Sequence, residues 1–228
     1  RSRARRLTWV PTHDALWRMK IALLAALAAM TLPATARADK LPPRDECAAD
    51  ASFAAFRTTL KGVVARKDAK ALLALTTPDI EYSLDVGTPG KAGFAKEWDL
   101  AHPAASSLWV ELDLALSLGC ALDRGEASIP YMYARLPQSR DTFATTVPGR
   151  PRVNLRASPN TDSPVVALLD WDILTVIDEK DSAWTHVKTD EGKDGYVRVD
   201  FLRNPLAYRA IFRKRDGKWM MAIFINGD

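Results

Sequence analysis

The chain has 228 residues, of which 32 are Lys or Arg and 28 are Asp or Glu, for a net charge of +4. Such a balance would indicate nucleic acid or anionic lipid as a partner. The excess charge is confined to the first 38 residues, which hold seven basic side chains and one acidic residue, Asp14. The remaining 190 residues carry 25 basic and 27 acidic side chains, net −2, so we expect no nucleic-acid partner.

Residues 19–38 have the layout of a secretory signal peptide. Met19 and a lysine precede an apolar run that ends near Ala36-Arg37-Ala38, a small-x-small cleavage site. The run is shorter than the roughly 20 residues that a membrane span needs, although an uncleaved membrane anchor is the alternative. We expect residues 1–18 to be a mis-assigned upstream segment. The mature chain would begin at Asp39, be periplasmic or secreted, and lack a stable membrane span.

Two cysteines, Cys47 and Cys120, are the only ones in the chain. An even number in an exported protein favours a disulfide, and two buried reduced cysteines are the alternative. On the chain-entropy account, closing so long a loop stabilises the fold by about 4–5 kcal/mol.

Residues 39–148 are expected to form a helical, α+β domain, because apolar side chains recur at three- and four-residue steps. The first expected helix starts at Asp45, with Cys47 in its first turns, and has an apolar stripe of Phe53, Phe56, Leu60, Val63 and Val64. A second helix over residues 68–75, capped by Asp68 and stopped by residues 76–79, is followed by a strand over residues 80–84. A short helix that carries Phe94 and Trp98 comes next, and then an apolar helix that is capped by Ser107 and ended by Gly119. Tyr131 and Tyr133, which flank Met132, are expected to cover an edge of the core.

No catalytic or metal-binding pattern is evident in this half. His102 and His186 are the only histidines after residue 38, and neither has the close-spaced partners that zinc requires. A Cys120–His102 pair is the nearest approach to a thiol hydrolase site, and a disulfide is the favoured alternative. Asp79, Glu81 and Asp85 are candidates for the paired carboxylates of a glycoside hydrolase. We expect them instead to form a solvated acidic edge. We therefore expect a noncatalytic protein with no metal and no cofactor.

Residues 148–151, with two prolines and a glycine, are expected to mark a domain boundary. After it the pattern changes to short alternating strands. Five of them fall within about fifty residues, near residues 153–155, 165–169, 173–177, 184–188 and 196–199. This spacing predicts a small barrel or sandwich.

The motifs of residues 151–204 resemble those of the bacterial SH3 domain (Src homology 3-like, SH3b). The resemblance is carried, in order, by Val153-Asn154-Leu155-Arg156, Ser158-Pro159, Ser163-Pro164-Val165-Val166, Trp184-Thr185-His186-Val187, Gly195-Tyr196-Val197 and Phe201-Leu202. Where the family usually has a Lys-Gly type of turn, this chain has Asp170-Trp171-Asp172. The resemblance implies a noncatalytic module that binds peptidoglycan or a cell-envelope protein.

Three aromatic residues, Trp171, Trp184 and Tyr196, are the candidate ligand-binding residues of this module. Trp184 occupies a strand position usual for core packing, which is the competing interpretation. Trp171 lies in a turn between acidic residues and is expected to be the most exposed. We expect an exported binding protein; a cell-wall hydrolase targeted by this module is the alternative.

Residues 205–228 have the signature of a β-hairpin around Asp216-Gly217, a pair typical of a type I′ turn. An isolated hairpin is marginal in water, so this one is expected to return to the first domain and leave the barrel as an insertion. A terminal hairpin of this kind also resembles α+β domains of the nuclear-transport-factor-2-like type. The predicted fold is therefore an α+β N-terminal domain with an all-β SH3-like barrel and a returning hairpin.

Overall fold

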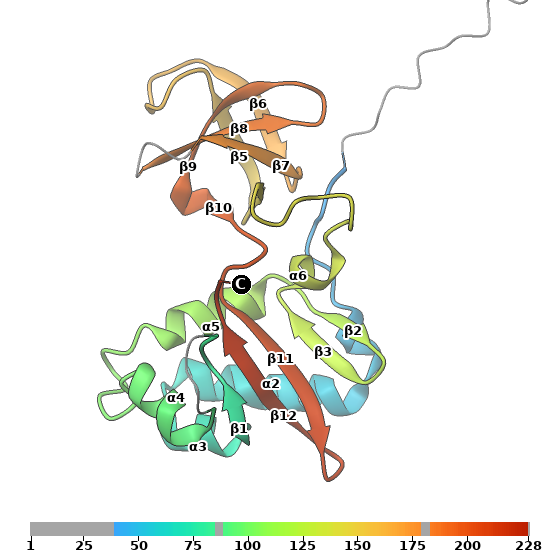
Figure 1. Cartoon of the computed structure of the whole chain (residues 1–228), viewed down its shortest axis with the longest axis vertical. Helices are drawn as coiled ribbons and strands as arrows, with labels where there is room; N and C mark the ends of the chain where they lie inside the picture. The colour runs from blue at the N-terminus through green and yellow to red at the C-terminus, as the bar shows by residue number, and fades with distance from the viewer. Residues whose placement is uncertain (1–38, 85–88, 179–182, 228) are drawn as a thin grey trace, which may run out of the picture. The chain divides into compact units, whose positions relative to one another are not determined.

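The computed structural model describes residues 39–84, 89–178 and 183–227. The expected signal peptide and upstream segment lie outside these residues. Two sheets organise the rest: a five-stranded sheet in the order β1-β12-β11-β3-β2 and a seven-stranded sheet in the order β10-β4-β7-β8-β9-β5-β6 (Figure 1). Within the described residues, no helix has the length and apolar character needed to cross a membrane.

The helices and strands divide between the two sheets. The elements around the first sheet are the 3₁₀ helix η1 (Glu46–Ala49), α2 (Ala51–Ala65), α3 (Ala69–Ala74), β1 (Thr76–Glu81), α4 (Lys91–Glu97), α5 (Leu108–Ser117), β2 (Ala121–Asp123), β3 (Glu126–Ile129), α6 (Tyr131–Arg135), β11 (Arg209–Arg215) and β12 (Lys218–Ile225). The second sheet is built from β4 (Thr145–Pro148), β5 (Pro151–Arg156), β6 (Val165–Asp170), β7 (Leu174–Asp178), β8 (Trp184–Thr189), β9 (Asp194–Arg198), the 3₁₀ helix η2 (Val199–Phe201) and β10 (Leu202–Arg203).

The terminal hairpin belongs to the first sheet, as predicted. β12 pairs in parallel with β1, and β11 pairs antiparallel with both β12 and β3. Its turn residues Asp216 and Gly217 have φ values of 51° and 75°, the positive values that a type I′ turn requires. Because the sheet of β4–β10 lies between β3 and β11 in the chain, it is inserted into the α+β fold.

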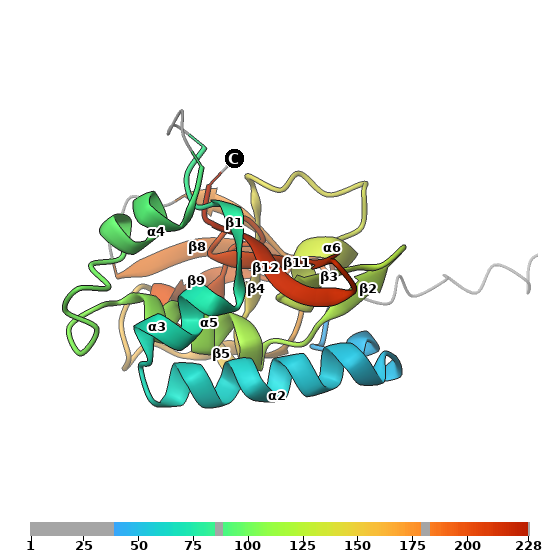
Figure 2. The same cartoon turned by 90° about the horizontal axis from the view of Figure 1, so that it is seen from below.

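Helix α2 packs on this sheet through its predicted apolar stripe, along one face as Figure 2 shows. Phe53 is fully buried and makes edge-on ring contacts with Phe212 on β11, at 5.3 Å between centroids, and Trp219 on β12, at 4.9 Å. The helix begins because the Asp50 carboxylate accepts a hydrogen bond from the Phe53 N–H at 3.0 Å. The strands of the terminal hairpin thus complete the core that the first helix begins.

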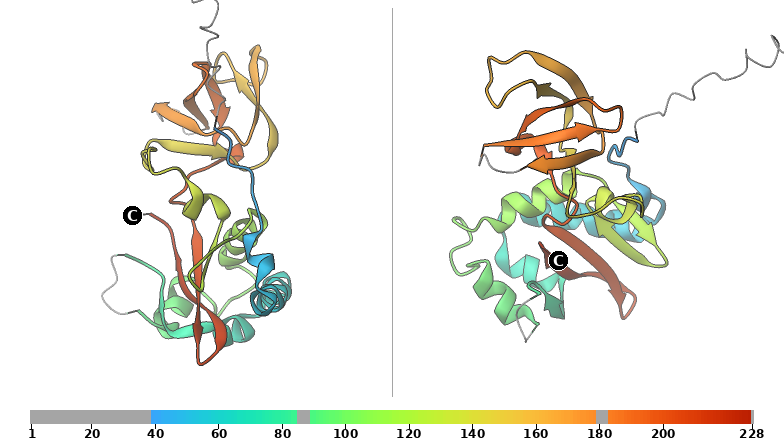
Figure 3. Two further views of the ribbon diagram at one scale, coloured as in Figure 1. Left: turned by 90° about the vertical axis from the view of Figure 1, so that its right-hand side faces the viewer. Right: turned by 45° about the horizontal axis from the view of Figure 1, so that its top comes forward.

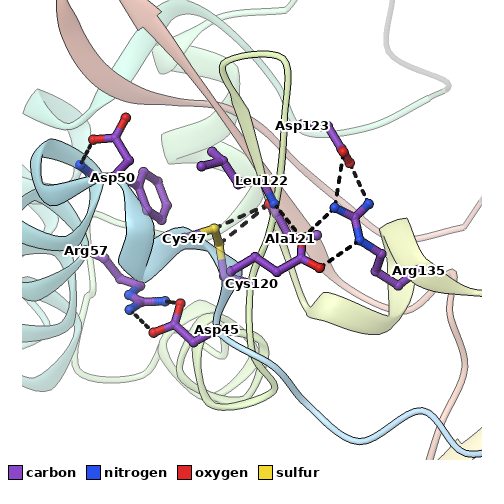
Figure 4. Close-up of a disulfide and its surroundings, with 11 residues drawn as sticks. Asp45, Cys47, Asp50, Arg57, Cys120, Ala121, Leu122, Asp123 and Arg135 are labelled. Atoms are coloured by element: carbon purple, nitrogen blue, oxygen red, sulfur yellow. Dashed lines mark hydrogen bonds and ion pairs between the residues drawn. A yellow bond between two sulfur atoms is a disulfide. The ribbon is translucent and has the colours of Figure 1, made fainter.

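The Cys47–Cys120 disulfide is present, with Cα atoms 5.7 Å apart. It joins η1 to the residue before β2, and the Arg135 guanidinium nearby binds the carboxylates of Glu46 and Asp123 (Figure 4). These hydrogen bonds from Arg135 hold the pKa of both carboxyl groups below their ordinary values. Cys47 lies in η1, since α2 begins only after the Asp50 cap, and not in the first turns of a helix from Asp45 as expected.

Three further features of the structure differ from what the sequence predicted. Strand β1 begins at Thr76, although residues 76–79 were expected to end a helix; Pro78 is tolerated because β1 is an edge strand. The β2–β3 hairpin was not expected, and its Arg124-Gly125 turn is the signal in the sequence. The Ser107 side chain makes no cap hydrogen bond at the start of α5.

Candidate functional site

The inserted sheet has one buried face and one open face. Residues from five strands pack together on the inner side: Val153, Leu155, Leu169, Leu174, Val187 and Val197. Because side chains alternate along a strand, the residues between them point outward. On β5 the outward residues are Arg152, Asn154 and Arg156.

Two of the three predicted aromatic residues share this outward face. Trp184 on β8 lies directly opposite Arg198 on β9, and His186 lies opposite Tyr196. The rings of His186 and Tyr196 stack at 4.6 Å, and Tyr196 is also opposite Arg156 on β5. Trp184 and Tyr196 are both partly exposed, so neither belongs to the buried core of the sheet. Their role as ligand contacts stays a prediction.

A pocket of about 210 Å³ opens on this face beside Trp184. Four arginines line it, together with two aromatic rings and three smaller side chains: Arg150, Arg152, Arg156, Arg198, Trp184, Phe201, Val153, Asn154 and Thr161. None of these lining residues is acidic. The pocket therefore gathers positive charge around aromatic surface.

Local contacts hold the arginines in place. The Arg150 guanidinium lies 3.9 Å from the centre of the Phe201 ring, a cation–π contact. Arg156 Nη1 donates to the Ser163 carbonyl oxygen at 2.7 Å. Arg198 pairs with Asp200, which lies outside the lining. Among the described residues the other three form no ion pair, so no carboxylate in this part of the chain neutralises their charge.

This arrangement suits an acidic ligand. A guanidinium group offers planar paired donors that match a carboxylate or phosphate, and it stacks on flat groups. Trp184 and Phe201 add apolar ring faces that can cover the rest of such a ligand. The arginines were not singled out from the sequence, although Arg150, Arg152 and Arg156 have the even spacing that places side chains on one strand face.

Trp171 is in a different place from the other two aromatic residues. It was expected to be the most exposed of the three; all three side chains have intermediate exposure, so this ranking stays a prediction. The Trp171 side chain packs against a cluster that includes Leu41, Met132 and Ile173. It also adopts a positive φ of 63°, which is unusual for a bulky residue. The turn contacts the rest of the protein and is not part of the arginine-lined pocket.

Cys120 and His102 do not form the pair that a thiol hydrolase needs. Cys120 is oxidised, and His102 is exposed with its Nδ1 2.9 Å from Asp99 Oδ1. Asp79 and Glu81 are both exposed on β1 and line a pocket with Arg213, Lys214 and Arg215. Asp79 pairs with Arg215 at 2.5 Å, and Asp85 lies outside the described residues. In the part of the chain that the structure covers, no three His, Cys, Asp or Glu residues cluster as metal ligands would.

A family model matches the segment that forms most of the inserted sheet. Residues 151–203 match the family model of the bacterial SH3 domain, so the chain contains a bacterial SH3 domain, which implies a cell-wall-binding module. No curated protein matches the chain.

Two solved structures also resemble the chain. One is a variant titled Rd1NTF2_05, at 11% identity and a TM-score of 0.30, covering 77% of this chain and 96% of that one. The other is a conserved protein from Planctomyces limnophilus DSM 3776, at 11% identity and a TM-score of 0.29, covering 79% and 95%. Scores of this size do not establish a common fold.

Proposed function

We propose that this protein is an exported, noncatalytic binding protein whose SH3 domain holds acidic peptidoglycan in the arginine-lined pocket. The observation that carries the proposal is the convergence of Arg150, Arg152, Arg156 and Arg198 around Trp184 and Phe201, with no acidic residue in the lining.

The chemistry of the ligand fits the pocket. Peptidoglycan peptides carry free carboxylates, which a guanidinium group binds through two parallel hydrogen bonds. The sugar rings of its glycan have apolar faces that can lie on an aromatic ring such as Trp184. The Cys47–Cys120 disulfide supports a location outside the cytoplasm, because disulfides persist in oxidising compartments.

Retention on purified peptidoglycan sacculi tests the proposal. The double variant Arg150→Ala/Arg152→Ala removes from the pocket two charges that no described carboxylate pairs with. Since each charge-assisted hydrogen bond contributes about 1.5–3 kcal/mol, we expect at least about a tenfold loss of retention. Retention of the native protein should also fall as salt is raised, because exposed charges are screened.

A matched control removes two exposed basic residues elsewhere, Arg66→Ala/Lys70→Ala, and should retain native binding. Equal retention of the pocket variant and the native protein would overturn the pocket assignment. If sacculi do not retain the native protein but an acidic envelope protein does, the ligand is a protein partner. Lytic activity in a peptidoglycan zymogram would overturn the noncatalytic assignment.

A further inference from the structure

A second pocket, of about 290 Å³, lies in the α+β domain and shares no residue with the SH3 pocket. Elements far apart in the sequence form it at one end of the sheet: Tyr82 follows β1, Trp98 follows α4, Tyr208 precedes β11 and Asn226 follows β12. Its volume is close to the lower limit of about 300 Å³ for small-molecule sites.

Three aromatic rings line this second pocket, and each packs on another ring. Tyr208 lies 4.9 Å from Trp98 and stacks on the buried Phe224 at 5.4 Å. Tyr82 meets the buried Phe94 edge-on at 6.3 Å. The core of the domain therefore fixes the orientation of all three rings before any ligand arrives.

Gly93 on α4 makes room for one of these rings. A Cβ atom at this position would overlap the Tyr82 hydroxyl and the adjoining ring carbon. The absence of a side chain at Gly93 thus allows the Tyr82 ring to lie against α4, and any larger residue there would displace it.

The charge near the three rings is negative. Glu97 is exposed and lines the pocket, and within the described residues no basic side chain is recorded as its partner. No Lys or Arg is among the lining residues. Burial raises the pKa of Tyr208, and the carboxylates of Glu111 and Glu97 raise it further, which agrees with a negative field at this ring. Glu111 Oε2 lies 3.4 Å from Arg203 Nη1 and forms an ion pair with it. The negative charge of Glu97 has no such partner among the described residues and acts on the pocket.

We propose that this pocket binds an alkylammonium group, with Tyr82, Trp98 and Tyr208 around the cation and Glu97 as its counter-ion. The faces of aromatic rings carry negative charge density, and a cation within about 6 Å of a ring centre is attracted to it. Such a site is independent of the SH3 pocket, which selects the opposite charge. The ammonium group can come from a free small molecule or from a lipid headgroup.

Calorimetric titration of the native protein with choline and with tetramethylammonium tests the site. The neutral isostere 3,3-dimethylbutanol, in which carbon replaces the charged nitrogen, measures the contribution of charge. We expect both cations to bind in the micromolar to millimolar range, and the isostere to bind at least about tenfold more weakly. Equal binding of the isostere, or no heat from either cation at millimolar concentration, would overturn the proposal.

Variants assign the binding to this pocket. Glu97→Gln should weaken choline binding about tenfold through loss of the counter-ion, while Glu81→Gln, one residue before Tyr82 and outside the pocket lining, should leave it unchanged. Gly93→Ala should also weaken binding, and a thermal melt will separate displacement of Tyr82 from general unfolding. If Glu97→Gln binds choline as tightly as the native protein, Glu97 is not the counter-ion and the proposal is wrong.

Vesicles distinguish the two sources of the ligand. If phosphatidylcholine vesicles retain the native protein and excess free choline releases it, the group is a lipid headgroup. If free choline binds and the vesicles do not retain the protein, the group belongs to a soluble molecule. Both outcomes support a cation site, and neither depends on retention by peptidoglycan.

Discussion

The backbone N–H of Leu41 donates a hydrogen bond to the carbonyl oxygen of Trp171 at 2.8 Å. The Ile173 N–H donates in turn to the Asp39 carbonyl at 3.1 Å, and Lys40 Nζ lies 3.6 Å from Asp172 Oδ1. The N-terminal segment thus pairs with the acidic turn of the SH3 domain, as can be followed along the blue segment in Figure 3. The turn that departs from the SH3 pattern is the turn that this segment contacts.

Trp171→Ala should therefore lower stability without changing ligand binding. The variant loses apolar contacts with the cluster around Leu41, and we expect the free energy of unfolding to fall by about 1–3 kcal/mol. Denaturant unfolding measures this change, and Trp171→Phe, which keeps most of the ring contact, should lose less. Native stability in Trp171→Ala would show that the turn is only surface, and weaker retention on sacculi at unchanged stability would place Trp171 in the binding site.

Removing the disulfide should destabilise the α+β domain strongly. The two cysteines are 73 positions apart, so on the chain-entropy account the double variant Cys47→Ala/Cys120→Ala should lose about 4–5 kcal/mol. Unfolding of the native protein with and without reductant should give the same direction of change. If reductant has no effect on the native protein while free-thiol labelling confirms reduction, the bond contributes no stability.

The terminal hairpin should be required for the first domain to fold. Phe224 on β12 is fully buried against Trp98 and Tyr208, so Phe224→Ala should cost about 3–5 kcal/mol. Removal of residues 206–228 should abolish cooperative unfolding of this domain. Phe143, which is 66% exposed, supplies the control, because Phe143→Ala should change stability by less than about 0.5 kcal/mol. A cooperative, unchanged melt of the truncated chain would contradict the sheet order.

Acid should weaken the start of α2. Hydrogen bonds from the Ser52 hydroxyl and then the Phe53 N–H lower the pKa of Asp50 from 3.8 to about 2. Because the folded-state pKa is the lower one, the carboxylate stabilises the fold above about pH 4, and this contribution disappears as the pH falls from about 4 to about 2. NMR titration should find the pKa near 2 in the native protein.

Melting temperatures over the same pH range provide a second measurement of this cap. Asp50→Ala should be less stable than the native protein at pH 5, and the difference should narrow toward pH 2. Val110→Ala, at an exposed position on α5 with no titratable side chain, should lack this narrowing. A difference between Asp50→Ala and the native protein that stays constant with pH would mean that the charge of Asp50 contributes nothing.

Elements with a local signal were predictable from the sequence. The Asp68 cap of α3 and the Asp216-Gly217 turn depend on neighbouring residues, and the motifs of the SH3 domain follow one another in the chain. The apolar stripe of α2 was predicted, but its start was placed too early because a 3₁₀ helix carrying Cys47 precedes it.

Elements stabilised by distant residues were not predictable. β1 runs through Pro78 because β12, more than a hundred residues later, provides its partner strand. The position of Trp171 depends on Leu41, and the pocket arginines converge only when β5, β9 and η2 come together. The alternation of apolar and polar residues predicted a strand at Trp184, but it did not show which face of that strand the rest of the domain covers.

The insertion of β4–β10 between β3 and β11 has a mechanical consequence. A domain joined to its neighbour end to end transmits a pull through one stretch of chain. Here a pull on the SH3 domain reaches the first sheet through two covalent connections, one leaving β3 and one entering β11. Backbone hydrogen bonds to the N-terminal segment, such as that between Leu41 and Trp171, provide a third route. Load borne while the protein is held to a wall would be divided among these three attachments, and β11, central in the first sheet, would receive part of it directly.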